Sequence, residues 1–135
     1  MKLTPTVISL AALFSVAYAE IVPVCINSVY DNPQTSPNDV GCSNGINGPI
    51  GSLPTFPNFG AAFAARAWNS PECGSCWKLT YEGTGNTIYV TAIGTDSSCF
   101  ELSPQSVNTL TNGQGNQLSV IYVQATQVAD SFCGL

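Results

Sequence analysis

The 135-residue chain contains no histidine. Ser-His-Asp and Cys-His mechanisms both need an imidazole as general base, and many zinc sites need one as a ligand. Most hydrolase classes and every histidine-ligated metal site are therefore excluded. We expect neither a cofactor nor a metal.

Charged residues are also scarce, at 8% of the chain. Once an N-terminal segment described below is removed, Arg66 and Lys78 are the only cations against eight carboxylates, a net charge of −6. Nucleic acids and anionic membranes are bound by clustered Lys and Arg, so we expect neither as a partner. The surface must be largely neutral and hydrogen-bonding, which suits uncharged carbohydrate and equally suits simple solubility in an extracellular fluid.

Long apolar runs are absent except at the N-terminus. Lys2 precedes an apolar stretch from Val7 to Val16, which ends in the small-residue sequence Ala17-Tyr18-Ala19. This pattern is typical of a secretory signal peptide, and the stretch is shorter than the ~20 apolar residues that span a membrane. We predict cleavage after Ala19, no membrane anchor, and a single secreted domain over residues 20–135, extracellular or bound to a cell wall.

Six cysteines in an exported domain predict three disulfides, for which sequence alone permits 15 pairings. They are Cys25, Cys42, Cys73, Cys76, Cys99 and Cys133. The spacing of Cys73 and Cys76 also invites a thioredoxin-like redox interpretation. That motif begins a helix in a βαβ pattern, whereas Trp77 to Tyr81 alternates like a strand, so we favour structural disulfides.

Hydrophobic periodicity predicts a mainly β domain with short helices. We expect strands over residues 21–30, 77–81, 87–93 and 117–129, and helices over 61–68 and 103–110. The second and third strands should form a hairpin, because the glycine-containing segment 82–86 has the length of a hairpin loop. Residues 31–60 are rich in Pro, Asn, Ser and Gly and predict a long loop, with one short strand around Val40.

No catalytic motif surrounds the eight carboxylates that remain after cleavage. Glycoside hydrolysis requires two carboxylates held at a defined separation, and scattered ones are usually solvated surface charges. Aromatic rings offer another route to carbohydrate, because a sugar's apolar face can stack on a ring. Trp68, Trp77 and Tyr30 are candidates for that role, and packing against the disulfides is the alternative for each.

The segment from Trp68 to Tyr81, WNSPECGSCWKLTY, closely resembles a signature of the cerato-platanin family of fungal secreted proteins. Further collinear matches are Tyr30-Asp31, the segments 42–48 and 53–60, and the C-terminal segments 124–128 and 133–135. The resemblance implies a double-psi β-barrel stapled by disulfides. It also implies the pairs Cys42–Cys73 and Cys76–Cys133, which leaves Cys25–Cys99 as an addition to the family's four-cysteine pattern.

The same resemblance implies a non-enzymatic protein that binds chitin or N-acetylglucosamine oligomers, loosens wall polysaccharide and is perceived as a defence elicitor or immunomodulator. A host receptor is therefore a second candidate partner. The resemblance places Tyr30, Asp31, Asn44 and Gln124 in a shallow groove. The family's usual aspartate after the third strand falls on Gly94, and Asp96 is the nearest carboxylate, which we add to the ligand-binding candidates.

Two other functions stay open at this point. One is a weak glycan-active enzyme that uses Asp31 or Asp96 as its carboxylate. The other is a signalling or surface protein whose partner is a host receptor, or another copy of itself at an air–water interface.

Overall fold

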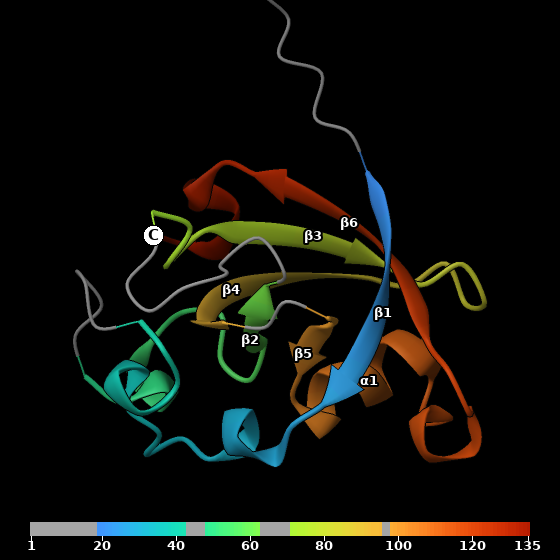
Figure 1. Cartoon of the computed structure of the whole chain (residues 1–135), viewed down its shortest axis with the longest axis horizontal. Helices are drawn as coiled ribbons and strands as arrows, with labels where there is room; N and C mark the ends of the chain where they lie inside the picture. Colours follow the sequence, from blue (N-terminus) through green and yellow to red (C-terminus); the bar gives the residue numbers. More distant parts are fainter. Residues whose placement is uncertain (1–18, 43–47, 63–70, 96–97) are drawn as a thin grey trace, which may run out of the picture.

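A computed structural model describes residues 19–42, 48–62, 71–95 and 98–135, and its strands form a closed barrel (Figure 1). The strands follow the order β1-β5-β2-β4-β3-β6 around the barrel. Their bounds are β1 Glu20–Ile26, β2 Phe59–Ala62, β3 Cys76–Thr80, β4 Thr87–Thr95, β5 Phe100–Leu102 and β6 Tyr122–Val128.

The barrel contains both parallel and antiparallel strand pairs, and the parallel pairs require crossing connections. β1 with β5 and β2 with β4 are parallel, whereas the other four pairs are antiparallel. Parallel neighbours cannot be joined by a hairpin, so the chain must pass across the barrel between them. The predicted class, a mainly β disulfide-stapled barrel of the double-psi type, is confirmed.

Among the residues that the structure describes, one α-helix and five 3₁₀ turns accompany the strands. The helix α1, Pro104–Thr111, confirms the prediction of a short helix over 103–110. Ser103 is its N-cap and Asn112 ends it in the left-handed conformation, as the Ser-Pro start and the Asn-Gly end of the sequence predict. The 3₁₀ turns are η1 Ser28–Asp31, η2 Pro37–Asp39, η3 Ile50–Ser52, η4 Gly115–Gln117 and η5 Asp130–Cys133.

The predicted hairpin is also present. β3 and β4 pair antiparallel, with Lys78 opposite Tyr89 and Leu79 opposite Ile88. Leu79 and Ile88 are buried inside the barrel while Lys78 points outward and is exposed, which is the period-two alternation of a half-buried strand.

The predicted helix over residues 61–68 is wrong at its start, because Ala61 and Ala62 belong to β2; residues 63–70 lie outside the described chain. Alanine favours a helix in isolation, but here β2 is fully buried and pairs with both β4 and β5. Any side chain on Gly60 would overlap the carbonyl oxygen of Glu101, so this close strand contact requires glycine.

Two other predicted strands are shorter than expected. The first ends at Ile26, because the side chain of Asn27 accepts a hydrogen bond from the Val29 N–H and begins η1. The last begins at Tyr122, after η4 has taken up Gly115–Gln117. In place of the strand expected around Val40, the structure has a single bridge between Gly41 and Gly94.

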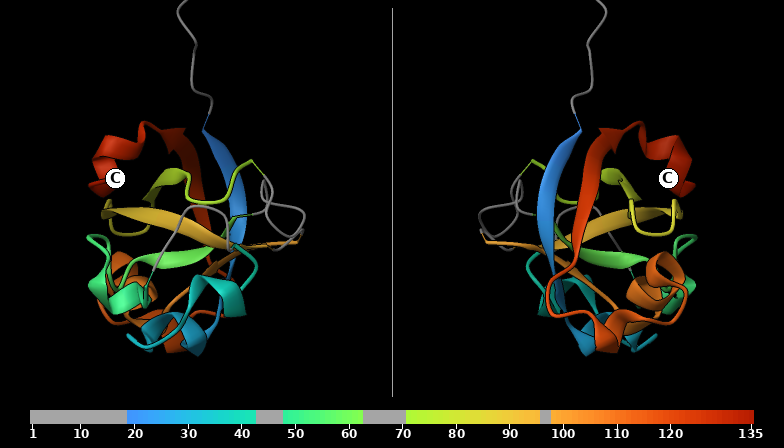
Figure 2. Two further views of the ribbon diagram at one scale, coloured as in Figure 1. Left: turned by 90° about the vertical axis from the view of Figure 1, so that its left-hand side faces the viewer. Right: turned by 90° about the vertical axis from the view of Figure 1, so that its right-hand side faces the viewer.

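Two hydrophobic cores lie on opposite sides of the sheet. The first fills the barrel, where Trp77 and Phe100 meet edge to face with centroids 5.8 Å apart. The second lies outside β2 and β4, where Tyr30, Ile50 and Phe59 are fully buried beneath the 3₁₀ turns of the N-terminal half. These turns and α1 gather on one side of the barrel, opposite β3 and β6 (Figures 1 and 2).

Three disulfides connect these layers and confirm the predicted pairing. They are Cys25–Cys99, Cys42–Cys73 and Cys76–Cys133. Cys73 and Cys76 are therefore bonded to different partners, which is incompatible with the redox interpretation of their spacing.

The signal peptide stays a prediction, because residues 1–18 lie outside the described chain. Within the described residues, no helix has the length and apolar character needed to cross a membrane.

Candidate functional site

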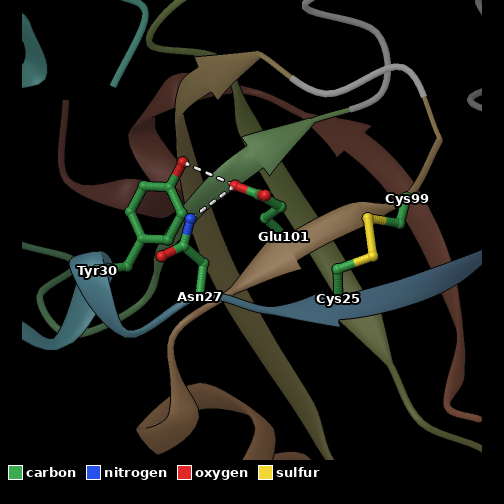
Figure 3. The surroundings of a disulfide bond; sticks show 5 residues. All are labelled: Cys25, Asn27, Tyr30, Cys99 and Glu101. Atoms are coloured by element: carbon green, nitrogen blue, oxygen red, sulfur yellow. Dashed lines mark hydrogen bonds between the residues drawn. A yellow bond between two sulfur atoms is a disulfide. The ribbon is translucent and has the colours of Figure 1, made fainter. Parts of the chain in front are cut away.

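A polar cluster lies where β1 ends beside β5 (Figure 3). The Asn27 amide donates a hydrogen bond to Oε2 of Glu101 at 3.2 Å, and the Tyr30 hydroxyl donates to the same oxygen at 3.4 Å. Asn27 is fixed from both ends, because its own Oδ1 caps η1 while its Nδ2 reaches the carboxylate. The parallel pairing of β1 with β5 and the Cys25–Cys99 bridge hold the two sides of the cluster together.

Tyr30 is only 1% exposed and its ring is part of the second core. The sequence suggested that this ring could stack on a sugar, and the burial contradicts that arrangement. The chain segment after η1 packs over the ring, which loop-like composition does not reveal. The hydroxyl points instead toward Glu101 (Figure 3).

Gly94 makes room for this hydroxyl. A Cβ at Gly94 would overlap the Tyr30 oxygen and would lie 3.0 Å from both the Ala61 Cβ and the Val40 carbonyl oxygen. The resemblance to the family suggested an acidic residue at this place. In this chain the space is filled by Tyr30, so the nearest carboxylate in the cluster comes from β5 instead of β4.

Asp31 is half-buried and connects η1 to α1. Its Oδ1 accepts a hydrogen bond from the backbone N–H of Gln105, in the first turn of α1, at 3.3 Å. The carboxylate therefore satisfies an N–H that has no partner within the helix. Tyr30 and Asp31 are adjacent in the chain, but Tyr30 bonds Glu101 and Asp31 bonds the helix α1.

Asn44 and Asp96, two further predicted ligand-binding residues, lie outside the described chain. The described residues that flank them are Cys42 and Thr95, which follow the bridge between Gly41 and Gly94.

Gln124 lies far from the cluster around Glu101. It is paired with Ile21 near the start of β1, whereas Asn27 follows the end of that strand, a separation of roughly 20 Å at about 3.3 Å per residue. Its amide donates a hydrogen bond to Glu82 on the neighbouring hairpin loop. The structure therefore does not bring Gln124 together with Tyr30 and Asp31.

Glu101 and Asn27 were not among the predicted ligand-binding residues. The available signal was the alternation Phe100-Glu101-Leu102 between a cysteine and a helix cap, which puts a carboxylate on the outer face of a strand whose neighbours face the core. Both bonds to Glu101 fall on Oε2, and within the described chain Oε1 has no partner. Glu101 is half-buried, so Oε1 can accept a hydrogen bond from a ligand hydroxyl or amide.

Metal binding finds no support in the described residues, which contain no group of three His, Cys, Asp or Glu side chains close enough to hold an ion.

Comparison with known proteins identifies a family and several relatives of this chain. The sequence model of the cerato-platanin family matches residues 22–135. The chain is 40% identical to allergen Asp f 15 of Aspergillus fumigatus, over 98% of this chain and 97% of that protein. It is 42% identical to the heat-stable 19 kDa antigen of Coccidioides immitis, over 78% of this chain and 76% of the antigen.

Solved structures agree with the sequence comparison. The crystal structure of cerato-platanin 3 from M. perniciosa superposes with a TM-score of 0.79 at 35% identity, covering 86% of this chain and all of that one. The solution structure of the fungal elicitor cerato-platanin superposes with a TM-score of 0.70 at 28% identity, covering 83% of this chain and 96% of that one.

Proposed function

The chain belongs to the cerato-platanin family, and on that premise we propose that it is a secreted, wall-associated fungal protein that binds chitin-type polysaccharide. In this proposal it loosens the packing of the polysaccharide without hydrolysing it. Its relatives are named as an antigen, an allergen and an elicitor, names that describe perception by a host. We therefore propose the same kind of perception, as a defence elicitor or immunomodulator, for this chain.

The observation that carries the proposal is the state of the Glu101 carboxylate. Two neutral donors bind its Oε2, while Oε1 has no partner among the residues that the structure describes and can accept a further bond. Such a carboxylate can bind a sugar hydroxyl or the N–H of an acetamido group. Asp31, which follows Tyr30 in the chain, accepts a hydrogen bond from the Gln105 N–H of α1 instead of joining this cluster.

Composition supports a neutral ligand. With a net charge of −6 after the predicted cleavage, the protein has no basic cluster that would attract a polyanion. Uncharged N-acetylglucosamine polymers avoid that electrostatic cost.

The first test is retention of the mature protein on insoluble chitin, cellulose and xylan. We expect retention on chitin and weak binding of soluble N-acetylglucosamine oligomers, about micromolar to millimolar, because a shallow polar site buries little apolar area. The proposal fails if none of these polysaccharides retains the protein.

Binding should depend little on salt. Salt screens interactions between charges, and neither partner contributes opposed charge clusters. Retention on chitin measured between low and high ionic strength should therefore stay nearly constant. A steep loss of retention at high salt would contradict the proposed contacts.

Glu101→Gln tests the binding site and the absence of hydrolysis together. We expect the substitution to weaken oligomer binding by about 0.5–1.5 kcal/mol, the contribution of one hydrogen bond. Asp39→Asn, an exposed carboxylate on η2, is the matched control and should bind like the wild type. Isothermal calorimetry measures both.

Neither the wild type nor Glu101→Gln should release reducing ends from chitin, chitosan or cellulose. Release by the wild type that is lost in Glu101→Gln, Asp31→Asn or Asp96→Asn would establish the enzymatic alternative instead.

A further inference from the structure

The outer face of β4, β3, β6 and β1 is a second surface with the chemistry of carbohydrate binding. Along each of these strands every second side chain points away from the barrel core. The 3₁₀ turns of the N-terminal half and α1 lie on the other side of the barrel (Figure 2). The outward side chains of this face, which we call the β3–β6 face, are Ile21, Pro23, Lys78, Thr80, Tyr89, Tyr122, Gln124 and Thr126.

One end of the β3–β6 face carries a stacked aromatic pair. The rings of Tyr89 on β4 and Phe132 on η5 are nearly parallel, with centroids 5.4 Å apart and 15° between their planes. Phe132 is 58% exposed although it is a large apolar side chain. The disulfide between Cys76 and the adjacent Cys133 fixes η5 against β3 and β4, so this ring is already positioned before any ligand binds.

The other end carries a second exposed ring. Tyr122 on β6 is 55% exposed and lies opposite Pro23 of β1, with the 69% exposed Ile21 one diagonal position away. From Tyr122 to Tyr89 the path covers four residues along β6 and two strand spacings, so their Cα atoms lie on the order of 15 Å apart. This separation suits several linked sugars rather than one.

Hydrogen-bonding side chains occupy the space between the rings. Thr126, Lys78 and Tyr89 lie side by side across β6, β3 and β4, and Gln124 and Thr80 form the neighbouring row. Lys78 is the only cation in the described chain, and no residue there forms an ion pair or a side-chain hydrogen bond with its ammonium group. Rings that stack on apolar sugar faces, separated by donors and acceptors for hydroxyls, are what an extended pyranose chain requires.

We propose that the β3–β6 face is a second glycan-binding surface, which lies against the flat side of an uncharged β-linked polysaccharide such as chitin or cellulose. This face is separate from the Glu101 cluster. It includes residues near the start of β1, whereas the cluster lies at the end of β1. The inference rests on the proposed function, and it adds a surface that acts on the polymer rather than on one sugar unit.

Charge favours this occupant over the alternatives. A second copy of the chain would bring together two proteins that each carry a net charge of −6 after the predicted cleavage, and a polyanionic glycan would meet the same repulsion. A neutral polysaccharide does not have this cost.

The test compares Tyr122→Ala, Phe132→Ala and the double variant with wild type on insoluble chitin and cellulose. Both rings are more than half exposed, so the variants should fold, and thermal unfolding verifies this. We expect each substitution to weaken retention about fivefold and the double variant more than tenfold, from a loss of about 1 kcal/mol of stacking per ring.

Tyr122→Phe keeps the ring and should bind like wild type. Ile26→Ala, an exposed apolar residue outside this face, is the control.

The outcomes distinguish the proposed polysaccharide binding from the second surface on the β3–β6 face. Wild-type retention that Tyr122→Ala and Phe132→Ala leave unchanged overturns the second surface and leaves the proposed function in place. Absence of wild-type retention on any polysaccharide overturns both. A change in oligomeric state of the double variant in sedimentation, without weaker retention, identifies the surface as an interface between copies and also overturns the inference.

Discussion

Gly94 and Tyr30 show how one missing side chain determines what a neighbouring residue can do. The hydroxyl of Tyr30 occupies the space that a Cβ at Gly94 would need, and from there it reaches Glu101. The sequence identified both positions but gave no indication that they touch, because the residues lie 64 positions apart and only the fold brings them together.

Gly94→Ala should destabilise the protein by about 1–3 kcal/mol, since the added methyl group forces Tyr30 or the β4 backbone to move. Urea unfolding monitored by fluorescence measures the loss. If the hydroxyl is the cause, adding Tyr30→Phe to Gly94→Ala should cost less than the sum of the single changes, by about 1 kcal/mol. Additive effects would show that the methyl group clashes elsewhere.

Ser103 determines how one whole element, the helix α1, is attached to the rest of the fold. Its fully buried hydroxyl accepts a hydrogen bond from the Ser106 N–H at 3.0 Å and donates to the Pro57 carbonyl at 3.0 Å. The same oxygen therefore begins the helix and attaches it to the chain before β2. Asp31 bonds Gln105 in the same first turn, so two separate segments of the chain hold the N-terminal end of α1.

Ser103→Ala should lower the free energy of unfolding by about 1–3 kcal/mol, because it removes the cap and leaves buried donors and acceptors unpaired. Thr109→Ala is the matched control on the exposed side of the same helix, and it should change stability by less than about 0.5 kcal/mol. Equal effects for the two substitutions would argue against a special role for the cap. Denaturant titration distinguishes them.

The elements that could be predicted from the sequence are those whose local signals agree with their surroundings. The hairpin of β3 and β4 and the helix α1 have both periodicity and turn residues in the expected places. β2 could not be predicted, because its alanines favour a helix and only pairing with two neighbours makes them a strand. Of the candidate site, Tyr30 and Asp31 were identified by resemblance, whereas Glu101 depends on strand register, which the sequence alone does not specify.

At the scale of the whole molecule, the three disulfides join segments that are far apart in the chain. Cys25–Cys99 closes 74 residues and connects the first strand to the segment before β5. The other two close 31 and 57 residues. In the entropic description, longer closed loops restrict the unfolded chain more and stabilise the folded state more.

Replacing Cys25 and Cys99 by alanine should lower stability by about 4 kcal/mol while the barrel is retained, since the other two bridges remain. Replacing Cys42 and Cys73 should cost about 3.5 kcal/mol, slightly less because its loop is shorter. Thermal unfolding of both double variants measures the difference. A loss of native circular dichroism in the first variant would mean that this bridge is required for folding itself.

The position of β1 between β5 and β6 has a consequence for the biosynthesis of the protein. Residues 20–23 can pair with 122–125 only after nearly the whole polypeptide has been synthesised, so the first strand to appear is among the last to be paired. Until then β1 presents open strand edges, which are prone to aggregation. Of the three bridges, Cys42–Cys73 can form first, and Cys76–Cys133 must wait for the end of synthesis. Correct folding during synthesis therefore requires that the N-terminal strand stays unpaired and accessible until β6 has been made.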